Sequence, residues 1–415
     1  YKDIAPWYDY VEKFAGISGQ AEGLPQLPDG QFMPAMEMNC VEKEVKKRIE
    51  SQFKGRIMTM GRVANITKPL PGRTNCQYRN LCSRGCPFGA YFSTQSSTLP
   101  AAMATGNLTL RPDSIVNSII YDEKQNKATG VRVIDTHTKQ MTEFYAKVIF
   151  VNGSTLGTTF VLLNSTSSRF PNGLGNDSGV LGKYLMDHHF RTGASGRAEG
   201  FDDKYYFGRR ANGIYIPRYR NIGSDKRDYL RGFGYQGGAS REGWSRGVAE
   251  LGVGKDFKDM LSEPGNWSIG LGGFGECLPY ESNQVTLDNS VKDDWGQPVL
   301  KFDAEFKENE KKMRVDMMND AAEMLEAAGM KDIKTFDNGS YPGMAIHEMG
   351  TARMGRDPKT SILNGYNQMH AVKNVFVTDG AAMTSAACVN PSLTYMALTA
   401  RAVDYMYKEM KKGNI

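Results

Sequence analysis

The order of helix-like and strand-like segments is the feature that most constrains this fold. Strand patterns over residues 108–122 and 128–153 precede a helix that begins near Ser154. Residues 200–300 are rich in Gly, Tyr and Trp and carry brief strand-like runs, as in an antiparallel sheet. A long amphipathic helix over 305–330, closed by Gly329, then leads back into α/β material. This order predicts a mixed α/β (α+β) chain in which one domain is discontinuous.

The size and charge of the chain restrict its class. At 415 residues with 40% apolar content, the chain can fill the cores of two domains that share an interface. The net charge is +5, and neither sign gathers in a long block, which excludes an obvious nucleic-acid surface. Mean hydropathy is -0.47, and no stretch approaches about 18 consecutive apolar residues, so we expect no membrane-spanning helix.

The two ends of the chain both read as helices. Residues 1–16 place apolar side chains at spacings of three and four behind Pro6, and residues 393–415 read as another helix with a polar, frayed tail. The start shows no basic segment followed by an apolar one, so no export signal is visible. Residues 18–36 read as a loop because Gly and Pro interrupt the apolar pattern.

Three of the six cysteines are clustered, with the spacing C-x5-C-x3-C followed by Pro87. Cys76, Cys82 and Cys86 are too few, and too widely spaced, for an ordinary four-ligand zinc site. They could form one disulfide and leave a spare thiol, or they could bind an iron–sulfur cluster. The remaining three are expected to be small buried apolar residues: Cys40, Cys277 and Cys388.

Two glycine-containing segments are candidates for a nucleotide site. Gly270, Gly272 and Gly275 satisfy G-x-G-x-x-G, but strand-like sequence follows them where a phosphate-binding turn needs a helix. The turn Asn152-Gly153 is better placed, between a buried strand and a helix, where a backbone can approach a ligand. It could also be a plain connection between strand and helix.

The last quarter of the chain gathers polar groups in a Gly-rich context. His347 lies in AIHEMGTARMG, Asp379-Gly380 ends a strand that starts at Val375, and Asn390 precedes Pro391 at the start of the final helix. Each feature has an ordinary structural reading, because a loop histidine is often a satisfied structural residue and Asn before Pro is often a helix cap.

Taken together, these motifs resemble the glucose-methanol-choline (GMC) oxidoreductase family. The pair HEMGTARMG and TDGAAM...NPSLTYMALTARAVDYM is similar to the C-terminal pattern of that family. YKDIAPWYDYVEKFAGISG, VIFVNGSTLGTTFVLLNS, GVLGKYLMDHHF and GECLPYESNQVTLD follow in the family's order. The resemblance therefore covers much of the chain.

The resemblance implies FAD as cofactor and a function for particular residues. His347 would accept the substrate's hydroxyl proton as general base, and Asn390 would hold the substrate oxygen. The hydride would pass to flavin N5. The resemblance places four residues near the flavin or its ribityl chain and two near the adenosine half: Asp379, Gly380, Pro391 and Thr394, then Val116 and Gly153.

Within the family, the cysteine pattern resembles bacterial FAD-dependent glucose dehydrogenases and glucoside 3-dehydrogenases. This implies that Cys76, Cys82 and Cys86 bind a 3Fe-4S cluster that passes electrons to a cytochrome-type acceptor, with a small accessory subunit as partner. It also implies a dehydrogenase of sugars or related alcohols in the periplasm or cell envelope. Aromatic residues of the sheet-rich block could stack on a pyranose ring or belong to the core: Tyr205, Tyr206, Tyr235 and Trp244.

The implied domain organisation has four parts. Residues 1–60 form substrate-domain or cap helices, 61–195 part of the FAD-binding domain with the Cys-rich loop 76–87, 196–335 the substrate-binding domain, and 336–415 the C-terminal part of the FAD-binding domain. The family's dinucleotide fingerprint precedes the segment that resembles residues 1–19, and nothing here matches it. The alternative function is therefore a non-catalytic relative that binds a partner or a sugar.

Overall fold

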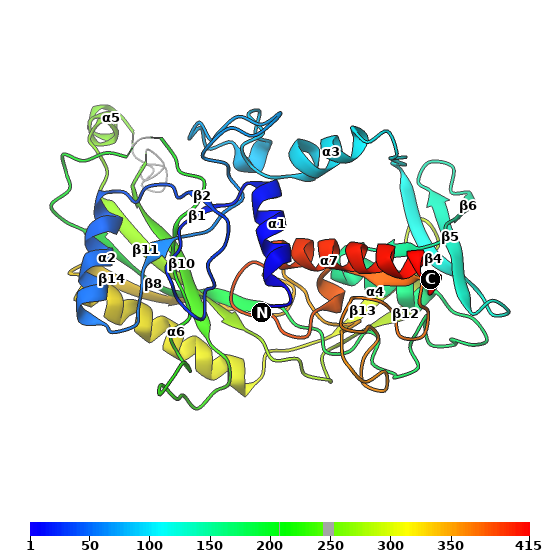
Figure 1. The fold of residues 1–415 in the computed structure, drawn as a ribbon. Coiled ribbons are helices and arrows are strands. Elements are labelled where there is room, and N and C mark those ends of the chain that lie inside the picture. Colours follow the sequence, from blue (N-terminus) through cyan, green and yellow to red (C-terminus); the bar gives the residue numbers. More distant parts are fainter. Residues whose placement is uncertain (207, 244–252) are drawn as a thin grey trace.

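The computed structural model describes residues 1–206, 208–243 and 253–415. The ribbon shows two lobes (Figure 1). One is built on a large sheet, and the other gathers smaller sheets around two helices. In the second lobe, β7 (Ile149–Val151) pairs in parallel with β15 (Val375–Val377), although more than 200 residues separate them in sequence. The prediction of a mixed α/β fold with a discontinuous domain is therefore confirmed.

The large sheet has the strand order β14-β8-β11-β10-β9-β3, and its pairings are antiparallel. Along the central strand β11, buried apolar side chains alternate with partly exposed positions, as expected for a strand with one covered face. The strands are β3 (Thr59–Met60), β8 (His188–Ala198), β9 (Ile214–Ile216), β10 (Phe233–Arg241), β11 (Trp267–Glu276) and β14 (Lys331–Asp337).

Two helices, α2 (Cys40–Gln52) and α6 (Glu308–Ala327), cover one face of the large sheet (Figure 1). The predicted helix over 305–330 is thus confirmed, and Gly329 follows it with φ 75°, a left-handed conformation that suits glycine. α2 begins with a capping box formed by Asn39 and Glu42. The helix α6 lies against the sheet through side chains at spacings of three and four: Met313, Met317, Ala321, Met324 and Leu325.

The G-x-G-x-x-G sequence lies wholly inside β11, a strand in the interior of the large sheet. Gly272 pairs with Gln236 on one side and with Gly193 on the other. A loop and the strand β12 follow, with no helix opening at the glycines. The prediction that this sequence is no phosphate-binding turn is confirmed.

The second lobe contains a meander of β4 (Ser114–Asp122), β5 (Lys127–Asp135) and β6 (Met141–Tyr145), and a hairpin of β12 (Gln284–Lys292) and β13 (Pro298–Asp303). The helix α4 (Ser154–Asn164) follows β7 directly, and α7 (Ser392–Lys411) ends the chain. Both helices start where the sequence predicts them. Buried Asn374 joins the meander to β15, because its side chain bonds the backbone N–H and C=O of Ala128.

The first and last helices lie against each other (Figure 1). α1 (Ala5–Ala15) has Pro6 in its first turn, as predicted, and ends at Gly16 with φ 77°. The hydroxyl of Tyr8 lies 2.5 Å from Thr394 Oγ1 on α7. The short elements are β1 (Ser18–Gly19), β2 (Met33–Pro34), η1 (Cys82–Arg84), η2 (Thr94–Thr98), α3 (Leu99–Met103), α5 (Lys255–Ser262) and η4 (Gly380–Ala382).

Among the described residues, no helix combines the length and the apolar character needed to span a bilayer. All six cysteines are described and all are free, so the disulfide alternative is not realised in this structure. Of the three scattered cysteines, Cys277 is buried, whereas Cys40 and Cys388 are only partly buried. The expectation of a buried apolar role thus holds fully for Cys277 alone.

Candidate active site

The carboxyl ends of β7 and β15 bring two turns together. The Asn152 side chain accepts hydrogen bonds from the backbone N–H of Thr378 at 3.2 Å and from its hydroxyl at 2.9 Å. Thr158 in α4 donates to Asp379 Oδ2 at 2.5 Å. Parallel strands that end beside a helix start are a frequent position for a nucleotide cofactor. The turn Asn152-Gly153 therefore contacts the C-terminal segment, as the hypothesis of a ligand-binding turn requires.

Asp379 is buried in this junction. Burial raises the pKa of its carboxyl to about 6, although bonds from Thr158 and from the N–H of Ala381 favour the charged form. The next residue, Gly380, has no room for a side chain, because a Cβ there would lie 2.2 Å from Thr155 Oγ1 and 2.5 Å from the carbonyl oxygen of Glu348. The pair Asp379-Gly380 is thus fixed by close packing.

His347 and Asn390, 43 positions apart, lie side by side. The distance between His347 Nε2 and Asn390 Nδ2 is 3.1 Å. Asn390 does not cap α7, because no side-chain bond caps that helix and its own amide bonds His347 and Gln236 instead. The capping interpretation of Asn390 is therefore wrong. Burial lowers the pKa of His347 below its ordinary 6.5, partly opposed by the charge of Asp187.

Asp187 shapes the loop that carries His347. Its two carboxylate oxygens accept backbone N–H bonds from His188 at 2.7 Å, Gly343 at 2.8 Å, Ala345 at 3.1 Å and His347 at 3.1 Å. One carboxylate therefore fastens the start of β8 to the loop before His347. This aspartate lies in GKYLMDHHF, where the family resemblance implies no particular role for it.

His188 and Gln236 also reach the candidate pair, and neither is predicted. His188 Nδ1 lies 2.9 Å from His347 Nδ1, and His188 Nε2 lies 3.1 Å from the carbonyl oxygen of Ala386. Gln236 Nε2 donates to Asn390 Oδ1 at 2.9 Å from β10. The adjacent histidines of the DHH sequence are the only signal that could have pointed to His188.

The face of the large sheet that carries Gln236 is lined with glycine. Gln236 lies opposite Gly272, and directly paired residues point to the same face of a sheet. A Cβ added at Gly270 would meet no atom within 4 Å, and one at Gly272 would meet only the backbone oxygen of Gln236 at 3.6 Å. Interior strand glycines that no neighbour requires often mark a place where a ligand approaches closely. This glycine face, Gly270 and Gly272, lies beside the residue that bonds Asn390.

The remaining residues expected near FAD occupy three places. Gly153 precedes the first turn of α4, while Asn117, next to Val116, bonds Asn164 at the other end of that helix. A helix of 11 residues is about 16 Å long, so the two positions bracket α4. Pro391 begins α7, and Thr394 bonds Tyr8.

One buried polar atom supports the fit of a cofactor here. The Tyr395 hydroxyl lies close to the position a Gly380 side chain would take, and it has no hydrogen-bond partner among the described residues. A buried hydroxyl without a partner is costly, and a polar ligand would supply one. The residues beside Asp379-Gly380 thus fit the polar part of a bound group.

The cysteine loop lies elsewhere, against residues 208–210 of the first lobe. Burial raises the pKa of Cys86, but the N–H groups of residues 88–91 stabilise its thiolate and bring the pKa below its usual value. Burial and the nearby thiols Cys82 and Cys86 raise the pKa of Cys76. Within the described ranges, no group of three or more Cys, His, Asp or Glu side chains is spaced to bind one metal ion.

The aromatic residues considered for sugar stacking differ in their burial. Tyr235 is fully buried in the core, and its hydroxyl donates to the carbonyl of Met317 at 2.7 Å, so the stacking interpretation is wrong for Tyr235. Tyr206 packs edge-on against Trp267, whereas Tyr205 is 68% exposed under the guanidinium of Arg241. Trp244 lies outside the described residues.

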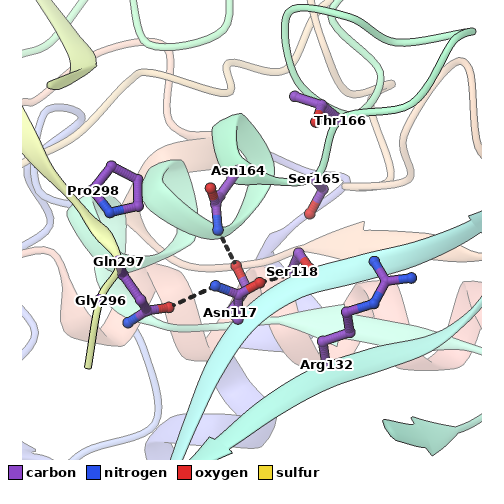
Figure 2. A pocket seen from close by; sticks show the side chains of 9 residues that line it. All are labelled: Asn117, Ser118, Arg132, Asn164, Ser165, Thr166, Gly296, Gln297 and Pro298. Atoms are coloured by element: carbon purple, nitrogen blue, oxygen red, sulfur yellow. Dashed lines mark hydrogen bonds between the residues drawn. The ribbon is translucent and has the colours of Figure 1, made fainter. Parts of the chain in front are cut away.

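A polar cavity of about 340 Å³ lies between the meander, the end of α4 and the β12–β13 turn (Figure 2). Its side chains bond one another: Asn117 donates to Gln297 at 2.9 Å, and Asn164 donates to the Asn117 carbonyl at 3.0 Å (Figure 2). None of the predicted site residues lines it. Val116 pairs with Val133, whereas the cavity-lining Arg132 is the adjacent residue of β5, so Val116 points to the face opposite the cavity.

The fold is that of a flavin-dependent oxidoreductase that acts on alcohols. The family described as GMC oxidoreductase matches twice, at residues 1–190 with its N-terminal part and at residues 279–399 with its C-terminal part. The chain belongs to the GMC oxidoreductase family, and it is an enzyme of the kind that acts on CH–OH groups with FAD as cofactor.

Individual relatives agree with this assignment. The chain is 32% identical to 2-methyl-1,2-propanediol dehydrogenase of Mycolicibacterium austroafricanum, over 98% of this chain and 73% of the relative. It is 25% identical to the fructose dehydrogenase large subunit of Gluconobacter japonicus, over 100% and 75%. Among solved structures, an FAD-dependent oxidoreductase from Chaetomium thermophilum has the same fold, with a TM-score of 0.59 and 10% identity over 99% of this chain and 80% of that one.

Proposed function

We propose that this chain is a dehydrogenase that oxidises a hydroxyl-bearing carbon of a sugar or related alcohol. His347 is the general base and Asn390 holds the substrate oxygen. The observation that carries the proposal is the 3.1 Å distance between His347 Nε2 and Asn390 Nδ2. These two atoms offer one acceptor and one donor to the same point.

A substrate hydroxyl matches both groups. Its proton is donated to His347 Nε2, while its oxygen accepts from Asn390 Nδ2, so that it replaces their direct contact. His347 is mostly neutral at pH 7, because burial holds its pKa below 6.5. Oxidation then moves the hydroxyl proton to His347 Nε2 as the C–O bond becomes a carbonyl. FAD, when bound, supplies the hydride acceptor for the carbinol carbon.

We assign FAD binding to residues in the segments that precede and follow Asn390 in the sequence. Asp379 and Gly380 form the buried turn after β15, and the orphaned Tyr395 hydroxyl lies beside it. Pro391 and Thr394 belong to the segment that follows Asn390. We assign Gly153 and Val116, at the two ends of α4, to the adenosine half.

The class of substrate rests on the relatives and on the open sheet face. The relatives include dehydrogenases of a diol and, by its name, of fructose. Next to Asn390, Gly270 and Gly272 leave space without apolar side chains. Such a surface suits a hydroxylated ring or chain, whose edges are polar and whose bulk needs room.

The proposal extends to electron transfer through the cysteine loop. Cys76, Cys82 and Cys86 are proposed to bind a 3Fe-4S cluster, in which each thiolate binds a different iron, so their sulfurs need not meet at one ion. The lowered pKa of Cys86 favours a thiolate ligand. One relative is named as a large subunit, which supports a small accessory subunit here, with a cytochrome-type acceptor in the periplasm or cell envelope.

Absorbance tests the main proposal. The purified chain, incubated with FAD and desalted, should keep bands near about 370 and 450 nm that a sugar or alcohol substrate bleaches without oxygen. Bands that no substrate bleaches, or a colourless protein that still binds a sugar, would favour the non-catalytic binding protein. Iron and sulfide analysis tests the cluster: Cys82→Ser should lose iron, while Cys40→Ser, a free cysteine outside the loop, should keep it.

A further inference from the structure

We propose that His188 is a positioning residue that holds His347 in the tautomer a general base needs, at the end of a chain of hydrogen bonds that begins at Gln236. The inference rests on the proposed function, because it concerns the same base. It adds two residues, His188 and Gln236, to which neither the local sequence pattern nor the family resemblance assigns a role.

The direction of the hydrogen-bond chain is determined at the carbonyl oxygen of Ala386. A carbonyl oxygen can only accept, so His188 Nε2, at 3.1 Å, carries the proton. His188 is fully buried, and burial lowers its pKa to about 4, so its ring is neutral near pH 7. A neutral imidazole has one N–H, and His188 Nδ1 is therefore an acceptor.

The remaining bonds follow from that first assignment. His347 Nδ1, at 2.9 Å from His188 Nδ1, must donate, which leaves His347 Nε2 with a free lone pair. Asn390 Nδ2 then donates to His347 Nε2 at 3.1 Å, and Gln236 Nε2 donates to Asn390 Oδ1 at 2.9 Å. Every bond points the same way, from Gln236 through Asn390, His347 and His188 to Ala386.

This order determines which nitrogen faces the substrate. In water a neutral histidine favours the proton on Nε2, and in that form His347 could not accept a proton on the side of Asn390. The bond to His188 reverses the preference, since the partner of one ring nitrogen sets the state of the other. After His347 takes up a proton, its Nδ1–H still has an acceptor in His188.

Among the described residues, Asp187 acts on both rings, because its carboxylate favours the protonated form of each. The charge of His347 lowers the pKa of His188, and His188 in turn lowers the pKa of its neighbour His189. Asp187 also fixes the backbone of His188 and His347 through N–H bonds of 2.7 and 3.1 Å. Because the main-chain N–H groups of both residues bond this one carboxylate, Asp187 fixes the distance between the two rings.

Filling space is the competing role for His188. Its ring meets Phe274 edge-on, with centroids 6.3 Å apart, so a residue that merely packs could stand there. The two roles differ in one requirement, because positioning needs an acceptor atom opposite His347 Nδ1 and packing does not.

Nitrogen NMR of the protein labelled with 15N-histidine reads the tautomer directly. The chain has five histidines, so substitution can assign the signals. Near pH 7.5 we expect His347 to be protonated on Nδ1 and bare on Nε2, and His188 to be protonated on Nε2. His347 protonated on Nε2 would overturn the proposal. The spectrum needs neither FAD nor substrate.

Variants separate an acceptor from a filler. His188→Asn keeps an acceptor oxygen at the position of Nδ1, whereas His188→Leu does not. We expect His188→Leu to lower kcat about 10- to 100-fold with KM within about two-fold, and His188→Asn to retain most of kcat. Equal losses in both variants, with an unchanged His347 spectrum, would mean that His188 only packs.

A substitution at Gln236 tests the direction of the hydrogen-bond chain, because it can reverse the order of donors and acceptors. Gln236→Glu presents an acceptor to Asn390, which should turn the amide and place its oxygen towards His347, favouring a proton on Nε2. Gln236→Glu should therefore lower kcat more than Gln236→Leu, and the reverse order would contradict the directed chain. His137→Asn, at a 76% exposed side chain, is the matched control and should change neither kcat nor the His347 signals.

The outcomes also distinguish this inference from the proposed function. If the protein oxidises no alcohol or sugar but His347 carries its proton on Nδ1, the proposed function fails and the tautomer assignment stands. If the protein is active but His347 carries its proton on Nε2, the proposed function stands and the positioning role of His188 is refuted.

Discussion

The two faces of the large sheet differ sharply, although the same strands supply both. On one face, Ile269 and Leu271 of β11 are buried against α6 and its neighbours. On the other, Gly270 and Gly272 of the same strand face open space, and Gln236 reaches Asn390. Alternation along a strand assigns successive residues to opposite faces. One strand thus stabilises the lobe with one set of residues and leaves room beside the candidate site with the other.

The neighbouring glycine Gly273 shows that this difference is not a matter of residue type. A Cβ at Gly273 would lie 2.4 Å from Met317 Cε, so this glycine is needed for packing against α6. Two adjacent histidines of β8 show the same difference between the two faces of the sheet. His188 bonds His347, whereas His189 is wholly buried with both ring nitrogens unpartnered among the described residues. Substitutions should therefore affect activity on one face and stability on the other.

The largest effect should come from His347→Ala. Loss of the general base should lower kcat about 10³-fold, equal to about 4 kcal/mol in the activation barrier. The melting temperature should change little, because the His347 ring is only partly buried. Steady-state kinetics beside thermal melting check this prediction. Turnover within tenfold of the unsubstituted enzyme would exclude His347 as the base.

Leu271→Ala should give the largest loss of stability. Leu271 is fully buried in the core beneath α6, and such truncations cost about 2–5 kcal/mol of unfolding free energy. Urea denaturation should show a lower midpoint with an unchanged slope. KM and kcat should stay near their usual values below the transition. A selective loss of activity would mean that the covered face also contributes to the site.

Acid should destabilise the fold through the two adjacent histidines. Burial lowers the pKa of His188 to about 4 and that of His189 to about 3, so the folded state stays neutral while the unfolded chain takes up protons below 6.5. Stability should therefore fall as the pH drops from 6.5 towards 4, by up to about 1.4 kcal/mol per pH unit for each histidine. Denaturation midpoints across this range measure the slope. His189→Leu should remove about half of it, and an unchanged slope would refute this cause.

The smallest effects should come from a matched pair of glycines. Gly273→Ala should cost about 1–3 kcal/mol of unfolding free energy, because the new methyl group overlaps Met317. Gly272→Ala should be neutral or stabilising by about 0.5 kcal/mol, since it restricts the unfolded chain in an open position.

The same pair sharpens the assignment of the open face. Gly272→Ala should raise KM about five-fold, equal to about 1 kcal/mol of binding, if substrate lies over this strand. Gly273→Ala should leave KM unchanged at temperatures where it is folded. Equal KM values in both variants would place the substrate away from the glycine face.

Local patterns in the sequence predict the elements of this fold well. The spacing of Met313, Met317 and Met324 predicts α6, and the short β-branched runs predict β4, β5 and β7. The nearness of His347 and Asn390 follows from a family resemblance, since the segment between residues 43 positions apart carries no periodic signal of contact.

What the sequence does not reveal are contacts that tertiary structure creates. Gln236 reads as one residue of an antiparallel strand, and only pairing of β10 within the sheet brings it to Asn390, 154 positions away. Asn390 before a proline has the local pattern of a helix cap, but two distant partners bind its amide instead. His188 and Asp187 are likewise defined by a loop that begins more than 150 residues later.

The backbone hydrogen bonds that Asp187 accepts have a consequence for protein engineering. Because one carboxylate ties the loop of His347 to β8, the base is anchored to a strand that does not contain Gly270 or Gly272. A library randomised at these two glycines could therefore vary the open face while the loop of His347 stays tied to β8. We expect substrate preference to be adjustable at these positions without displacement of the proposed base.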